Sequence, residues 1–268
     1  MIGTTSKSVG TTEPEAATER LVLTFDRVGF AYGDRTVMRD VSFGIGSGEI
    51  VSLLGTSGCG KTTILNLIAG FLRPTEGRAL VDGAEISGPG PDRGVVFQAA
   101  ALFDWMTVAE NIAFSLRCAG RSKRERRRVA EETAALVGLA GREDAYPYEL
   151  SGGMRQRVGL ARVLAARPRV MLMDEPFSAL DVQTREDLQE QVLRLRDRTG
   201  CTIVFVTHSI DEAVFLGDRV FLIDNLRQGQ FETFAVELNA PRASSENRLA
   251  PAFLRLREAI YRTMRHSH

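Results

Sequence analysis

The sequence predicts an α/β protein with a largely parallel sheet, an antiparallel β subdomain at its start and a helical subdomain in its middle. Three apolar runs of strand length, Glu49 to Leu54, Val170 to Met173 and Thr202 to Val206, each end in polar residues. Segments with helical spacing separate them. Buried strands alternating with helices are typical of a parallel sheet covered on both faces.

The elements follow this order along the chain. From Leu21, short β-type runs broken by Gly and Asp predict antiparallel strands that lead into the buried strand 49–54. Residues 62–69 have helical spacing, and residues 77–98 return to short strands around a Pro/Gly loop. Residues 99–166 are mainly helical in character, and 184–198 form a helix between the last two apolar runs.

Composition restricts the class of protein. The chain has 268 residues, is 44% hydrophobic and 25% charged, and has a formal net charge of zero. This is ordinary globular composition, and it gives no global attraction to nucleic acid. Cys59, Cys118 and Cys201 are far apart and fit no metal spacing, so we expect reduced thiols in the cytosol.

We divide the chain into three parts. Residues 1–20 lack the apolar segment of a secretory signal and are expected to be a mobile tail. Residues 21–240 form the main domain, with its helical subdomain at about 99–166. Residues 241–268 are a basic amphipathic tail. No run of about 18 apolar residues is present, so a membrane role requires a partner.

The C-terminal tail has one apolar helical face, made of Phe253, Leu256, Ile260 and Met264. We expect it to pack on the domain or on a dimer partner, with contact to a membrane surface as the alternative. The basic run Arg121 to Arg128 is interpreted as a solvated helix face, because acidic residues follow it directly.

The strand 49–54 runs into a phosphate-binding loop. Gly55, Gly60, Lys61 and Thr62 match the pattern G-x-x-x-x-G-K-[ST]. The glycines let backbone N–H groups turn toward phosphate oxygens, the lysine reaches the β- and γ-phosphates, and the threonine hydroxyl binds Mg²⁺. The predicted loop comprises Gly55, Thr56, Ser57, Gly58, Cys59, Gly60, Lys61, Thr62 and Thr63.

Two other strand ends carry polar groups. Asp174 is placed to hold Mg²⁺, and Glu175 to orient or deprotonate the attacking water. His208 follows the last strand, where it could contact a γ-phosphate. Alone, such residues are more often a strand-ending turn and a hydrogen-bonded histidine. Because ligands bind off the carboxyl ends of parallel strands, we expect these groups to meet the loop.

A second glycine-rich helix start lies in "LSGGMRQR". Ser151, Gly152 and Gly153 expose backbone donors to an anion without a lysine of their own. One site with a lysine and one without it suggest that two copies of the chain face each other and share nucleotides.

These motifs together resemble the nucleotide-binding subunits of ABC transporters. The match includes Tyr32 in "FAYG" as the aromatic that stacks on adenine, Gln98 in "VVFQ", and "SALD" ending at Asp181. It covers about Leu21 to Ile223. Residues 87–98 with the following "LFDWMTVAENIAF" are similar to the ATPases of nitrate, taurine and aliphatic-sulfonate importers.

The resemblance implies a mechanism. Two subunits enclose two Mg-ATP, each held between the Lys61 loop of one and Ser151 to Gly153 of the other. Glu175 activates water, and His208 contacts the γ-phosphate. Gln98 senses Mg²⁺ and the attacking water, and Asp181 links the two sites.

The resemblance also implies partners and a place in the cell. These are a homodimer, membrane permease subunits and, indirectly, an extracytoplasmic substrate-binding protein. The expected place is the cytoplasmic face of the inner membrane. Phe103 and Trp105 lie in the segment expected to receive the permease, with ordinary packing as the alternative. Asp104 stands where related importers often carry proline, and the segment after Ile223 lacks a common Arg-Pro-Gly turn.

Two other functions are alternatives to the importer. An exporter or lipoprotein-releasing ATPase shares every catalytic motif. A soluble ABC ATPase acting on nucleic acid or ribosomes is disfavoured, because the chain has no heptad run and no internal repeat.

Overall fold

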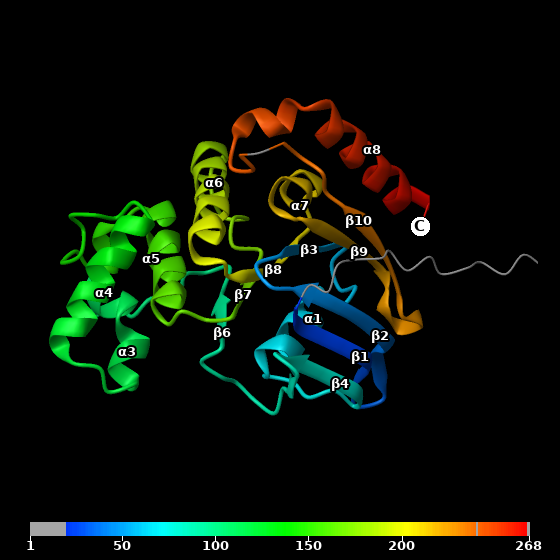
Figure 1. The fold of residues 1–268 in the computed structure, drawn as a ribbon, viewed down its shortest axis with the longest axis horizontal. Coiled ribbons are helices and arrows are strands. Elements are labelled where there is room, and N and C mark those ends of the chain that lie inside the picture. Colours follow the sequence, from blue (N-terminus) through cyan, green and yellow to red (C-terminus); the bar gives the residue numbers. More distant parts are fainter. Residues whose placement is uncertain (1–19, 240, 267–268) are drawn as a thin grey trace, which may run out of the picture.

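The computed structural model describes residues 20–239 and 241–266. Its centre is a six-stranded sheet with the order β10-β9-β3-β8-β7-β6 (Figure 1). Five strands are parallel, and β10 pairs antiparallel with β9 at the edge. The bounds are β3 (Ile50–Gly55), β6 (Arg93–Val96), β7 (Val170–Asp174), β8 (Thr202–Thr207), β9 (Arg219–Asn225) and β10 (Gln230–Ala235). The predicted parallel core is confirmed. Residues 1–19 of the predicted N-terminal tail (1–20) lie outside the described residues, and Arg20 is described.

A second, antiparallel sheet has the order β2-β1-β4-β5. Its strands are β1 (Leu21–Tyr32), β2 (Arg35–Gly46), β4 (Glu76–Val81) and β5 (Ala84–Glu85). Helix α1 (Lys61–Ala69) shares a core cluster with these strands and with one face of the parallel sheet. The antiparallel sheet therefore packs against the helix that follows the predicted phosphate loop.

The other face of the parallel sheet is covered by helices (Figure 1). They are α5 (Gly152–Ala165), α6 (Val182–Thr199), α7 (Ile210–Leu216) and α8 (Pro251–His266), and they share a second core cluster with residues of β3, β7 and β8. Helix α6 extends the predicted 184–198 at both ends, because Asp181 caps its start and Gly200 adopts a left-handed conformation at its end.

The helical subdomain contains α2 (Val108–Ile112), α3 (Phe114–Cys118), α4 (Lys123–Leu136), the short 3-10 helix η1 (Pro147–Glu149) and α5. Its first part, residues 99–107, is a loop and not a helix. Buried Asn111 explains this loop: its amide accepts from the Phe103 N–H and donates to the carbonyls of Phe103, Met106 and Thr107. These side-chain bonds satisfy backbone groups that would otherwise form the hydrogen bonds of a helix.

The basic run lies on the solvated side of α4, as predicted. Arg127 pairs with Asp144 at 2.7 Å, and Arg128 pairs with Glu132 at 2.8 Å. Exposed pairs of this kind contribute only about 0–1 kcal/mol each to stability, so they keep the face soluble more than they hold the fold.

The C-terminal segment packs back on the domain. After the 3-10 helices η2 (Leu226–Gln228) and η3 (Ser245–Leu249), α8 buries Phe253 and Ile260 completely. Leu256 and Met264 are partly buried against the same cluster. The predicted apolar face therefore faces this chain. Among the described residues, no helix has the length and hydropathy needed to cross a membrane.

Candidate functional site

Three polar strand ends meet at one edge of the parallel sheet. Strand β8 lies between β3 and β7, with Leu54 opposite Thr207 and Asp174 opposite Val206. The phosphate loop, the two carboxylates and the histidine follow directly on these neighbouring strands. The predicted convergence is confirmed.

The loop after β3 requires glycine at two positions. A Cβ at Gly55 would lie 2.5 Å from the carbonyl oxygen of Ile223. Gly60 has a φ of +109°, and a Cβ there would lie 2.7 Å from Leu226. The backbone can therefore turn here only without side chains. In the described chain, no side chain caps helix α1 at Gly60, so its first N–H groups remain available to a ligand.

Lys61 lies buried beneath this loop. Its Nζ donates to the carbonyl oxygens of Gly55 at 2.7 Å and Thr56 at 2.8 Å, and Cys59 Sγ is 3.8 Å away. These acceptors are neutral, so the charge of Lys61 is not cancelled by its hydrogen bonds. The loop therefore combines a buried cation with free N–H donors, which fits the phosphates of a nucleotide.

Asp174 and Glu175 form the carboxylate pair of the site. Burial and the neighbouring Glu175 raise the pKa of Asp174, and Lys61 partly opposes this rise. Glu175 has a φ of +45°, and its N–H donates to the Val206 carbonyl at 3.1 Å. A non-glycine residue held in this conformation stores strain of the kind found at functional sites.

His208 lies beside Glu175, with its Nδ1 at 3.3 Å from Glu175 Oε2. The histidine side chain is 62% exposed, so it is accessible to a ligand that the phosphate loop binds. The structure thus joins the two residues predicted to act on the attacking water and on the terminal phosphate.

The donors present at this edge fit Mg²⁺. In the residues described, no group of three or more His, Cys, Asp or Glu could hold a metal by itself. Mg²⁺ is usually bound by one or two carboxylates together with hydroxyl groups, waters and substrate phosphates. Thr62, Asp174 and Gln98 supply such oxygen ligands, and the raised pKa of Asp174 indicates an under-compensated carboxylate.

Gln98 reaches the site through a serine that the sequence analysis did not single out. Gln98 Nε2 donates to Ser178 Oγ at 2.9 Å, and Ser178 Oγ donates to the Glu175 carbonyl at 2.9 Å. The only sequence signal for Ser178 was its place in "SALD".

Tyr32 is half exposed at the end of β1, and its ring contacts that of Phe30 edge-on at 4.8 Å between centroids. The β1–β2 hairpin that carries it borders the phosphate loop, because a Cβ at Gly60 would lie 3.4 Å from Val37 of β2. The hairpin therefore presents an exposed aromatic ring next to the loop.

The second glycine-rich helix start lies apart from the first. Ser151 Oγ accepts from the Met154 N–H at 3.2 Å and caps α5. Gly153 packs on α6, where a Cβ would lie 2.4 Å from Thr184. Asp181 accepts from the Thr184 N–H at 3.0 Å, and this bond lowers the pKa of Asp181. Ser151 to Gly153 and Asp181 thus form one cluster, whereas α1 lies in another layer (Figure 1).

Comparison with known proteins agrees with this geometry. The family model described as ABC transporter matches residues 38–178. A nitrate import ATP-binding protein of Synechococcus elongatus is 46% identical over 231 residues, covering 85% of this chain and 35% of that protein. A taurine import ATP-binding protein of Pelagibacter ubique is 46% identical over 230 residues, covering 83% and 85% of the two chains.

A solved dimeric ATP-binding cassette, bound to ADP and Pi in a post-hydrolysis state, superposes with a TM-score of 0.69 at 32% identity. The match covers 80% of this chain and 99% of that one. Since the family model matches more than half of the sequence, the chain belongs to the ABC transporter family. It is an ATP-binding subunit that hydrolyses ATP for transport.

Proposed function

We propose that the chain works as a dimer that powers import of a small anion, such as nitrate or a sulfonate, through a membrane permease. The observation that carries the proposal is the separation of two glycine-rich helix starts in one chain. The start at Lys61 holds a cation and uncapped N–H groups, whereas the start at Ser151 has no lysine. The import relatives support the direction of transport and do not favour an exporter.

Within one subunit, Lys61 and the loop N–H groups bind the β- and γ-phosphates, and Tyr32 stacks on the base. Thr62, Asp174 and Gln98 would hold Mg²⁺, which would supply charge neutralisation at the phosphates when bound. Glu175 takes a proton from the water whose oxygen attacks the γ-phosphorus, and the bond to the bridging oxygen of ADP breaks. His208 orients Glu175 and contacts the γ-phosphate.

Across the dimer, Ser151 to Gly153 of the partner subunit close on the γ-phosphate. Asp181 lies in the same cluster as these residues through Thr184, so it can connect one nucleotide to the other. Dimer closure then drives the permease. A periplasmic-type binding protein delivers the substrate, and the subunit works at the cytoplasmic face of the inner membrane.

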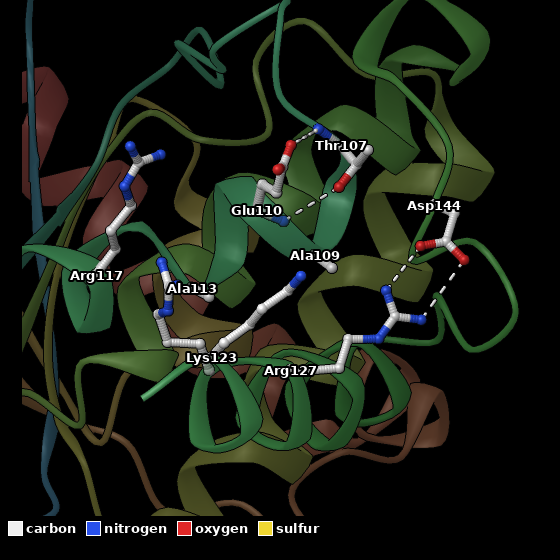
Figure 2. A pocket seen from close by; sticks show the side chains of 9 residues that line it. Thr107, Ala109, Glu110, Ala113, Arg117, Lys123, Arg127 and Asp144 are labelled. Carbon is white, nitrogen blue, oxygen red and sulfur yellow. Dashed lines mark hydrogen bonds and ion pairs between the residues drawn. The ribbon is translucent and has the colours of Figure 1, made fainter. Parts of the chain in front are cut away.

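The surface offered to the permease is the loop at Trp105 together with the pocket that Thr107, two residues further along, helps to line. Trp105 is 73% exposed, unlike a residue in ordinary core packing. The neighbouring pocket has a volume of about 260 Å³, and Figure 2 shows Arg117, Lys123 and Arg127 around it. Ala109 and Ala113 also line it. A cytoplasmic segment of the permease with an apolar side and an acidic group suits this surface.

The catalytic part of the proposal is tested with Glu175→Gln. This variant should bind ATP, lose turnover and accumulate as an ATP-bound dimer in size-exclusion chromatography, because the base is lost while the phosphate site remains. Glu132→Gln, which removes an exposed carboxylate on α4, is the control. Hydrolysis at the wild-type rate in Glu175→Gln would remove Glu175 from its role.

The transport part is tested by purifying the tagged chain from detergent-solubilised membranes of its own host. Co-purification of one multi-span permease, reduced by Trp105→Ala, supports the importer. Recovery of only ribosomal or DNA-repair proteins contradicts the transport assignment and leaves the ATPase chemistry unchanged.

A further inference from the structure

A buried polar network runs from the C-terminal segment to the residue before His208. Arg248 in η3 donates from Nη2 to Gln189 Oε1 of α6 at 2.5 Å. Gln189 Nε2 donates to Glu212 Oε1 of α7 at 3.1 Å. Thr207 Oγ1 donates to Glu212 Oε2 at 2.6 Å. Four side chains from four separate segments thus form one chain of hydrogen bonds.

The far end of this network shapes the turn that carries His208. Thr207 Oγ1 accepts from the Ser209 N–H at 3.0 Å, and Ser209 Oγ accepts from the Glu212 N–H at 3.3 Å. His208 is therefore flanked on both sides by residues bonded to Glu212. Since Glu212 is anchored by Gln189, a shift of α6 relative to α7 is passed to the turn.

The network is buried, so water cannot readily replace its bonds. Gln189 and Thr207 are each 1% exposed, and the Glu212 side chain is 12% exposed. A buried amide or carboxylate that loses its partner is costly to the structure, which favours one fixed arrangement.

The C-terminal segment also holds α7 directly. The Arg248 guanidinium lies 3.7 Å from the centroid of the buried Phe215 ring, and Arg242 donates to the carbonyls of Phe215 and Gly217 at the end of α7. The segment thus fixes α7 at its C-terminal end and, through Gln189 and Glu212, at its N-terminal end.

We infer that Arg248, Gln189 and Glu212 are positioning residues for His208, and that the C-terminal segment thereby sets the rate of ATP hydrolysis. The inference rests on the role proposed above for His208. It goes beyond that role because it states that residues outside the phosphate site orient His208. None of the three belongs to the proposed phosphate site; they act through Thr207 and the turn.

The experiment compares full-length variants by steady-state ATPase kinetics and by NMR of the His208 imidazole. Its signals are identified by their loss in His208→Gln. Arg248→Met should lower kcat about tenfold while KM for ATP stays within twofold, because a small misplacement near reacting groups costs rate more than binding. The His208 signals should shift. Arg248→Lys, which keeps a donor for Gln189, should recover most of the rate.

Arg257→Met is the matched control, because Arg257 lies in the same C-terminal segment but pairs with exposed Asp211 at 3.0 Å. It should leave both kcat and the His208 signals unchanged. Gln189→Glu provides an independent variant, since it places a second carboxylate against Glu212 without removing Arg248. Unchanged kcat and unchanged signals in both Arg248→Met and Gln189→Glu would overturn the inference, as would an equal loss in Arg257→Met.

The failure of this inference is distinguishable from that of the proposed function. If His208→Ala hydrolyses ATP at the wild-type rate, the role of His208 is wrong whatever Arg248 does. If His208→Ala loses turnover while Arg248→Met keeps it, only the positioning network is wrong.

Discussion

The two glycine-rich helix starts look alike in sequence and differ in construction. At α1, Gly60 has a left-handed backbone and leaves the helix without a side-chain cap, directly before the buried Lys61. At α5, Ser151 caps the helix through the Met154 N–H, and Gly153 allows contact with α6. The first therefore presents a buried cation and uncapped N–H groups within one chain. The second has a side-chain cap and no lysine of its own.

The largest effect is expected at the first start. Lys61→Ala removes the buried cation, so ATP affinity should fall on the order of 100-fold, with hydrolysis lost as well. Equilibrium titration with a fluorescent ATP analogue measures this. Lys123→Ala, at the exposed pocket of Figure 2, is the control. Retained affinity in Lys61→Ala would mean that the loop N–H groups alone hold the phosphates.

The second start should separate binding from turnover. Ser151→Arg places a bulky cation where the partner's nucleotide would approach, so hydrolysis should fall by at least about 100-fold while affinity for ATP in the monomer stays nearly unchanged. The same titration and a phosphate-release assay measure the two quantities. Equal activity in Ser151→Arg and wild type would contradict the shared-site model.

The two glycines of the second start should differ from each other. Gly153→Ala forces a Cβ to within 2.4 Å of Thr184 Cγ2, whereas a Cβ at Gly152 meets nothing within 4 Å. Because Thr184 is β-branched and its N–H is held by Asp181, we expect Gly153→Ala to lose about 1–3 kcal/mol of stability. Gly152→Ala should keep or slightly raise it. Urea unfolding measures both, and equal midpoints would contradict this account.

The smallest expected effect is the dependence of stability on pH that arises from Asp174, near the glycine-rich start of α1. Burial and Glu175 raise the pKa of Asp174 above that of the unfolded chain, so the folded state binds the proton more tightly. The contribution of Asp174 to stability therefore falls as pH rises through the interval between the two pKa values. Asp174→Asn should remove this loss and raise the melting temperature of the nucleotide-free protein at pH 7 by at most ~2 °C. Differential scanning calorimetry at pH 4 and pH 7 tests it, and a lower melting temperature at pH 7 would contradict it.

The sequence was sufficient to predict those parts of the site in which each group directly follows its own strand. Gly55, Asp174 and Thr207 each stand at the end of a strand, and the parallel pairing of these strands brings the three ends together. Contacts between distant segments could not be predicted in this way. Gly153 was interpreted only as a phosphate-binding residue, because its contact with Thr184 depends on how α5 meets α6. The bond from Gln98 to Ser178 has the same origin.

Residues 99–107 show another feature that the sequence did not predict. Their composition is compatible with a helix, but bonds from Asn111, a single residue outside the segment, hold them as a loop. Both the oxygen and the nitrogen of the Asn111 amide form hydrogen bonds with the backbone of this loop. The hydrophobic periodicity of the sequence does not indicate such bonds.

This bracing by Asn111 has a consequence for how the protein could diversify. Asn111 holds the loop through backbone atoms, so these bonds do not depend on which side chains stand at positions 104 and 105. A loop built this way is already ordered before it meets a partner, and little conformational entropy is lost on docking. Under the permease role proposed above, exchanging the two side chains is expected to alter which membrane protein is recognised without disturbing the catalytic edge of the sheet.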